Sequence, residues 1–221
     1  MTNFYDFRIE NIKDLSSEEK NLRKKNLDLF IQKGFPNKKN EDWKFTDLNT
    51  ILEKNFNNIV NKDDISEEKK LRKIYEFEHN FIFLVDGKLI SNSFDYEDKD
   101  SIFLKDYNYK DKIKLERQSS LTLLNSALAT GGFTLEVSKN YKFIKPLVIY
   151  NYFSKNLKES IINNKNLIIL NDDSELTLVN YIHDDTKENF MTNTIDNIII
   201  KRNASLKNIF INNSRCNGYF Y

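Results

Sequence analysis

The chain has few of the residues on which several protein classes depend. Its 221 residues include one cysteine, Cys216, and two histidines, His79 and His183. A single cysteine excludes an internal disulfide framework, which fits a reducing cytosol. Together these three residues are too few for a self-contained iron or zinc site. We therefore expect that this chain alone binds no metal and no other cofactor.

An excess of one charge and long apolar runs are also lacking. Lys and Arg number 34 against 33 Asp and Glu, a formal net charge of +1. No strong field therefore favours nucleic acid or an acidic membrane surface as a partner. No apolar run is long enough to span a bilayer, and residues 1–6 lack a basic region followed by an apolar core. The sequence predicts a soluble, cytoplasmic protein.

Sequence signatures of catalysis are missing as well. There is no phosphate-binding Gly-x-x-x-x-Gly-Lys-Ser/Thr loop, no Gly-x-Ser-x-Gly elbow and no Cys-x-x-Cys pair. The carboxylate pairs at 67–68 and 172–173 stand where helix caps or corners explain them. His183-Asp184-Asp185 is interpreted as a solvated turn rather than a cation site, and Cys216 as a small buried residue rather than an iron ligand. We expect no enzyme, and assign no catalytic, cofactor-binding or metal-binding residue.

The rare residues that are present concentrate in one block. Residues 34–48 read GFPNKKNEDWKFTDL and hold the only tryptophan, one of two prolines and one of five glycines. Before it, Ser16 and Glu19 have capping-box spacing for a helix from about Ser16 to Lys33, whose apolar face would carry Leu22, Leu29 and Phe30. Gly34 and Pro36 would end that helix. Thr46 or Asp47 would cap a second one carrying Leu48, Ile51, Leu52 and Phe56, with Trp43 at the joint as a packing anchor rather than a ligand.

Three regions follow from the change of hydrophobic period. Residues 1–75 are helical in period, with a further cap at 64–68, and residues 76–132 are mixed. The mixed region contains a hairpin around Asp86-Gly87, a short strand at 101–104, and a small-residue helix from Leu121 to Ala129 capped by Ser119 or Ser120. From residue 133 to 221 the pattern is that of strands.

A repeat is visible in this last region. An apolar strand, a four-residue polar corner and a second strand occupy 166–179 and recur about thirty residues later at 197–210. Repetition at this period predicts coils of a β-solenoid, and an antiparallel sandwich is the alternative. The predicted fold class is therefore α+β, an N-terminal helical region followed by an incomplete β-solenoid core.

The block at 34–48 resembles the N-terminal signature of the SufB/SufD family, and is closest to SufD. The matching positions are Gly34, Pro36, Glu41, Trp43, Lys44, Phe45 and Thr46. Residues 122–137, TLLNSALATGGFTLEV, resemble the lead-in to that family's right-handed parallel β-helix, and 145–147 with 166–179 resemble its first coils. The resemblance implies a scaffold subunit in iron–sulfur cluster assembly, a partner of SufB-like and SufC-like proteins, with the cluster handled by the assembled complex.

Two expectations complete this interpretation. Family members are about twice as long and dock SufC through a C-terminal helical region, so we expect a truncated chain with doubtful contact to SufC. We also expect its coil end to leave Ile209, Phe210 and Ile211 half covered. The cluster-forming residues of the family lie in later coils, so none is carried over to this sequence. A β-solenoid carbohydrate-active enzyme or another solenoid binding module is the alternative function, but no charged groove across successive coils is visible in the sequence.

Overall fold

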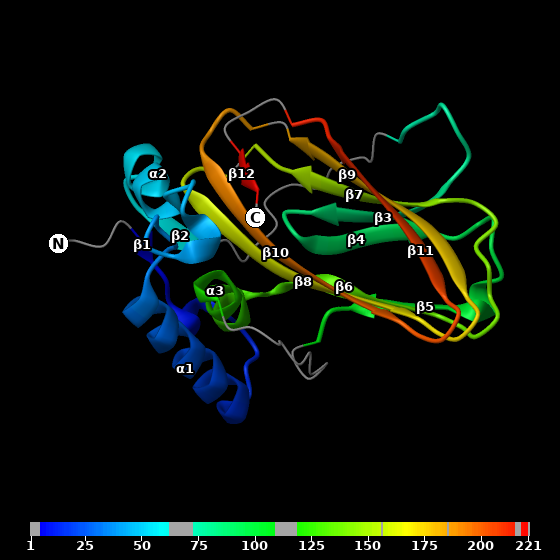
Figure 1. Ribbon diagram of the computed structural model, residues 1–221, viewed down its shortest axis with the longest axis horizontal. Coiled ribbons are helices and arrows are strands. Elements are labelled where there is room, and N and C mark those ends of the chain that lie inside the picture. The colour runs from blue at the N-terminus through cyan, green and yellow to red at the C-terminus, as the bar shows by residue number, and fades with distance from the viewer. Residues whose placement is uncertain are drawn as a thin grey trace.

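The computed structural model describes residues 5–61, 73–108, 119–155, 157–184, 186–214 and 218–220. Within them lie three α-helices, three short 3-10 helices and twelve strands (Figure 1). The helices are α1 (Ser17–Lys33), α2 (Leu48–Asn55) and α3 (Ser120–Leu128), with the 3-10 turns η1 (Ile9–Asn11), η2 (Glu41–Trp43) and η3 (Lys99–Ser101). The strands are β1 (Tyr5–Asp6), β2 (Ile59–Asn61), β3 (Asn80–Val85), β4 (Lys88–Ser93), β5 (Ile102–Asp106), β6 (Gly131–Val137), β7 (Leu147–Phe153), β8 (Ser160–Leu170), β9 (Glu175–Asp184), β10 (Phe190–Ile200), β11 (Ser205–Asn212) and β12 (Gly218–Phe220).

The strands form two mixed sheets, with the helices gathered at one end of the molecule (Figure 1). The larger sheet has the order β1-β2-β8-β10-β12, and β6 joins it through β8 while β5 pairs with β6. The smaller sheet has the order β11-β9-β7-β3-β4. The β3–β4 and β5–β6 pairs are antiparallel, and the remaining ladders are parallel.

The predicted thirty-residue repeat is confirmed by the strand register. Ser160 pairs with Phe190 and Leu170 with Ile200 along the whole of β8 and β10. Glu175 pairs with Ser205 by the same offset where β9 meets β11. Because these ladders are parallel, the alternative of an antiparallel sandwich is wrong.

The polar corners of the repeat also stack on each other. Arg202 donates to Asp172 at 3.1 Å and Asn203 to Asp173 at 3.0 Å, each across a step of thirty residues. Asp173 and Asn203 both have positive φ, at 60° and 54°. Asp and Asn tolerate this conformation better than most side chains, which explains their recurrence at the corner.

The two largest of four apolar clusters among the described residues lie on opposite faces of the larger sheet. One lies between the sheets and is built from buried Ile, Leu, Val and Phe side chains of β3, β6, β7, β8 and β9. The other lies where α1, α2 and α3 cover the outer face of the larger sheet, around Phe30, Leu52, Leu124 and Ile161. There α1 packs against α3, and α3 packs against β8 and β10. The helical end and the coil stack are therefore joined through one sheet.

The predicted helix caps are largely confirmed. The Ser16 hydroxyl accepts from the Glu19 amide at 3.2 Å, and Asp47 rather than Thr46 caps α2 by accepting from the Thr50 amide at 3.0 Å. Gly34 ends α1 with φ of 69°, but its ψ of −176° is extended and not the left-handed helical value. Ser119 is the residue that caps α3.

The predicted apolar face of α1 was partly wrong. Leu22 is 45% exposed, while Leu27 and Phe30 are buried. Arg23 is buried as well, and its Nη1 donates to the carbonyl of Ala127 on α3 at 2.9 Å. The buried face of α1 therefore differs from the predicted one. The buried hydrogen bond of Arg23 and the packing on α3 stabilise this orientation more than burial of Leu22 would.

The N-terminal region also contains two strands that the hydrophobic period of the sequence did not predict. β1 pairs with β2, and β2 pairs with β8 at Ser160 and Ile161. The first and third predicted regions thus share a sheet, while the boundaries at 75 and 132 stay predictions. The predicted cap at 64–68 and the carboxylate pair at 67–68 lie outside the described residues.

Candidate functional site

Trp43 lies in η2 between α1 and α2, half-buried against the core beneath the helices. This is the corner expected of it, and it acts there as a packing anchor. Phe45, two residues later, is 86% exposed, and the Lys44 ammonium lies 4.9 Å from the centroid of its ring. Nothing in the fold of the corner explains an exposed phenylalanine at this place.

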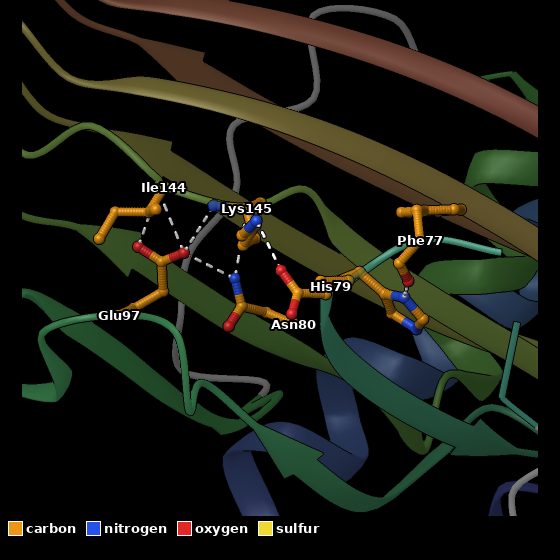
Figure 2. A network of polar contacts seen from close by, with 7 residues as sticks. Phe77, His79, Asn80, Glu97, Ile144 and Lys145 are labelled. Carbon is orange, nitrogen blue, oxygen red and sulfur yellow. Dashed lines mark hydrogen bonds and ion pairs between the residues drawn. The ribbon is translucent and has the colours of Figure 1, made fainter. Parts of the chain in front are cut away.

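The two histidines both pack against tyrosines of β7. His79 Nδ1 lies 2.9 Å from the carbonyl oxygen of Phe77, so this nitrogen carries the proton (Figure 2). Its Nε2 then accepts from the Tyr150 hydroxyl at 2.7 Å. The Tyr150 hydroxyl itself accepts from the amide of Ile74 at 2.8 Å. Burial is the main cause that raises the pKa of Tyr150.

His183 does not stand in a turn, as the sequence interpretation had it. His183 and Asp184 are the last two residues of β9, and Asp184 is buried. The His183 ring centroid lies 5.9 Å from that of Tyr152. Asp185 and Cys216 fall outside the described residues. Within the described part of the chain, no three His, Cys, Asp or Glu side chains gather as a metal-binding group.

A buried carboxylate that the sequence interpretation missed ties the β3–β4 hairpin to β7. Figure 2 shows Glu97 accepting from the Asn80 side chain at 2.7 Å and from the amides of Ile144 and Lys145. The Tyr141 hydroxyl donates to its second oxygen at 2.8 Å. Such a carboxylate is satisfied by its donors, so its role is to fix the loop before β7. Its four partners are spread over 65 residues, so no short sequence pattern could have indicated that Glu97 is buried.

The glycine pair at 131–132 marks a crossing of three chain segments. A Cβ on Gly131 would collide with the carbonyl oxygen of Gly87, and one on Gly132 with the carbonyl oxygen of Lys165. The amide of Gly132 donates to that Gly87 carbonyl at 2.7 Å. Asp86, beside it, is buried and accepts from both the amide and the hydroxyl of Ser154. The predicted hairpin turn is thus wedged against the start of β6.

Three cations from distant segments converge next to this crossing, at the C-terminal end of α3. Besides Arg23, the Lys88 ammonium donates to the Thr130 carbonyl at 2.7 Å, and the Lys165 ammonium to the Ser126 hydroxyl at 3.0 Å. A helix C-terminus carries a partial negative charge that favours cations. Burial, and secondarily the charge of Arg23, lower the pKa of Lys165 to about 8. A cavity of about 390 Å³ opens in front of Arg23 and Lys88.

A different kind of surface lies along β10 and β11. Among the residues that the structure describes, β11 is the outermost strand of the smaller sheet, and β12 pairs with β10 only from Phe190 to Thr192. Large apolar side chains are exposed along both strands: Ile198, Ile199, Ile200, Phe210 and Ile211. Phe210 is the most open of them, at 65%. Ile209 is half-buried against the outer face of the smaller sheet, as expected, whereas Phe210 and Ile211 are exposed. An open strand edge with apolar side chains is suited to pairing with another strand.

Among the helices in the described part of the chain, none is long and apolar enough to cross a membrane. No curated protein sequence matches the chain. Its residues 1–98 match the family model of the SufBD protein N-terminal region. That segment contains α1, the corner at Trp43, α2 and the β3–β4 hairpin, so this part of the chain is similar to the N-terminal region of SufBD proteins.

Proposed function

We propose that this protein is a SufD-like scaffold subunit of the SUF system, which assembles iron–sulfur clusters with a SufB-like partner and a SufC-like ATPase. The observation that carries the proposal is the match of residues 1–98 to the SufBD N-terminal region. The cluster is the cargo of the complex, and the chain has no turnover and no resident cofactor of its own. Its place would be the cytosol.

The architecture supports a scaffold role. We take the stacked strands as the first coils of a right-handed parallel β-helix, on the ground that β8 and β10, and β9 and β11, repeat with an offset of thirty residues. Coils of this kind present flat faces and strand edges to partners. They hold an assembly in register without supplying reactive groups.

The open edge at β10 and β11 is the surface that we assign to the SufB-like partner. Its backbone groups can extend a sheet by one strand, and its exposed isoleucines and Phe210 supply apolar area. Burying one such side chain is worth roughly 1.5–3 kcal/mol, so a few of them suffice for a specific contact. The partner surface would be another strand edge of the same type.

Co-purification tests the proposal. The tagged chain is co-expressed with cognate SufB-like and SufC-like proteins, singly and together, and retained protein is quantified. We expect capture of the SufB-like protein, and at least tenfold less capture by Phe210→Lys. Ile144→Lys is the matched control, because Ile144 is also exposed, at 69%, but lies between β6 and β7. Failure to capture either protein would count against the assignment to the SUF system.

Reconstitution with iron and sulfide tests the absence of a resident cofactor. We expect no stable cluster absorbance on the isolated chain. Stoichiometric absorbance that disappears in Cys216→Ser would contradict this part of the proposal and identify a ligand.

A further inference from the structure

Ser126 and Lys165 bring a hydroxyl and an amine together where α3 packs on β8. The Lys165 Nζ lies 3.0 Å from the Ser126 Oγ. Ser126 belongs to the last turn of α3 and Lys165 to the middle of β8, so regular elements position both groups. A serine with an amine base within hydrogen-bond distance is the arrangement that activates the nucleophile in Ser–Lys pairs.

The surroundings of Lys165 favour the neutral form of its amine. The side chain is 6% exposed, and among the described residues no carboxylate forms an ion pair with it. Arg23, itself paired with Glu19, is the charged group that faces it from α1. Burial and the charge of Arg23 lower the pKa of Lys165 to about 8, so a fraction of the chains holds the free amine near neutral pH. Only the free amine can take a proton from Ser126.

The hydroxyl is the accessible member of this pair. Ser126 is half-buried, whereas Asn125 and Ala127 on either side of it are fully buried. The apolar side chains of α3 face the core beneath the helices, so Ser126 lies at the margin of that contact. A small molecule therefore reaches the hydroxyl before it reaches the amine behind it.

We propose that Ser126 accepts an acyl group from a small acyl compound with a good leaving group, with Lys165 as its general base. The Ser126 Oγ attacks the carbonyl carbon and forms the new C–O bond, while Lys165 takes the hydroxyl proton. The bond to the leaving group then breaks, and the leaving group departs with its electron pair and receives that proton. The product is one acyl-serine per chain, and the step needs no oxidant, no reductant and no turnover. The site does not depend on the proposed SUF role.

Acetylation by p-nitrophenyl acetate tests the proposal on the full chain. Release of nitrophenolate gives the rate, and mass spectrometry of the peptide that contains α3 locates the acetyl group. We expect acetylation of Ser126 at least tenfold faster than that of Ser120, which is half-buried on the same helix and has no lysine partner among the described residues. The rate should rise with pH and level off above about pH 8, where Lys165 is the free amine.

Three variants separate this pair from general reactivity. Lys165→Met removes the base and should slow acetylation of Ser126 about 100-fold. Lys207→Met, on β11, removes an exposed lysine away from the site and should leave the rate unchanged. Ser126→Ala should abolish acetylation at this site, because the nucleophile is missing.

The proposal is overturned if Ser120 reacts as fast as Ser126, or if Lys165→Met reacts at the wild-type rate. Acetyl on Lys165 that persists in Ser126→Ala also overturns it, because the amine would then be the nucleophile. Should Lys165→Met fail to fold, the pH profile of the wild type decides the matter. A rate of Ser126 acetylation that keeps rising with hydroxide and never levels off contradicts a role for Lys165 as the base.

Discussion

At the scale of single residues, Gly132 illustrates how one missing side chain permits a crossing of segments. Its φ of 112° lies where L side chains are strained, and a Cβ would also meet the Lys165 carbonyl oxygen. Gly34 has a positive φ too, but no atom lies within 4 Å of its Cβ position. A side chain at Gly34 would meet backbone strain alone, whereas a side chain at Gly132 would meet both backbone strain and a steric collision.

The first prediction compares alanine at these two positions. Gly34→Ala should lower the free energy of unfolding by about 1–3 kcal/mol, the cost of a strained backbone conformation. Gly132→Ala adds the collision and should cost more than that, or prevent folding altogether. Urea denaturation followed by circular dichroism measures both. Equal costs would mean that the collision is relieved by movement of β8.

The second prediction concerns Lys165, whose pKa falls from 10.5 to about 8 through burial and the charge of Arg23. Between these values the unfolded chain holds a proton that the folded chain does not, so the free energy of unfolding rises with pH. Compared with Lys165→Met, the wild type should gain on the order of 3 kcal/mol between pH 8 and pH 10.5. Urea denaturation of both proteins across this range provides the check. Parallel pH profiles would show that Lys165 is solvated.

At the scale of elements, buried asparagines hold neighbouring strands in register. Asn163 on β8 donates to the Asn61 side chain of β2 at 3.1 Å and accepts from Asn193 of β10 at 2.9 Å. A shift of one residue would break this row and turn every side chain to the other face. This row of asparagines therefore favours the thirty-residue offset between β8 and β10 over a register shifted by one residue.

The third prediction tests that row. Asn163→Ala leaves polar groups of Asn61 and Asn193 without this partner, which should cost about 1–3 kcal/mol. Arg202→Ala removes an exposed contact across the same thirty-residue step and should change stability by no more than about 0.5 kcal/mol. Chemical denaturation of the two variants gives the comparison. Similar values would mean that the buried row adds nothing to the register.

Elements with a strong local signal could be predicted from the sequence. The period and caps of α1, α2 and α3, the Asp86-Gly87 turn and the repeated polar corners are all properties of short segments. β1 and β2 have two and three residues, which is too few to show the alternating pattern of a strand. They form because β2 pairs with the edge of β8 and β1 pairs with β2. The burial of Arg23 in place of Leu22 likewise depends on α3, which is a hundred residues away.

At the scale of the whole molecule, the open edge of β10 and β11 governs association. The fourth prediction is that the isolated chain self-associates as its concentration rises, because exposed apolar edges pair with one another. The double variant Ile199→Lys with Phe210→Lys should shift sedimentation velocity toward the monomer, whereas Ile144→Lys should not. A wild-type chain that stays monomeric at high concentration would show that the edge is protected.

The candidate sites were less predictable than the fold. Glu97, Lys88 and Lys165 are ordinary residues in the sequence, and they become informative only when the chain brings their partners within hydrogen-bond distance. His183 was misplaced because a polar run resembles a turn, although it ends a strand. A local pattern carries no information about which groups meet across 17, 42 or 39 residues, the separations of these three contacts.

The pairing of β2 with β8 has a consequence for the order of events during synthesis. Val60 finds its partner in Ser160, a hundred residues downstream. At typical translation rates of 5–20 residues per second, that strand leaves the ribosome roughly 5–20 s before the segment that completes its sheet. The N-terminal helices must wait in that interval with their apolar faces uncovered. A nascent chain of this length would therefore be a natural client for chaperones until β8 emerges.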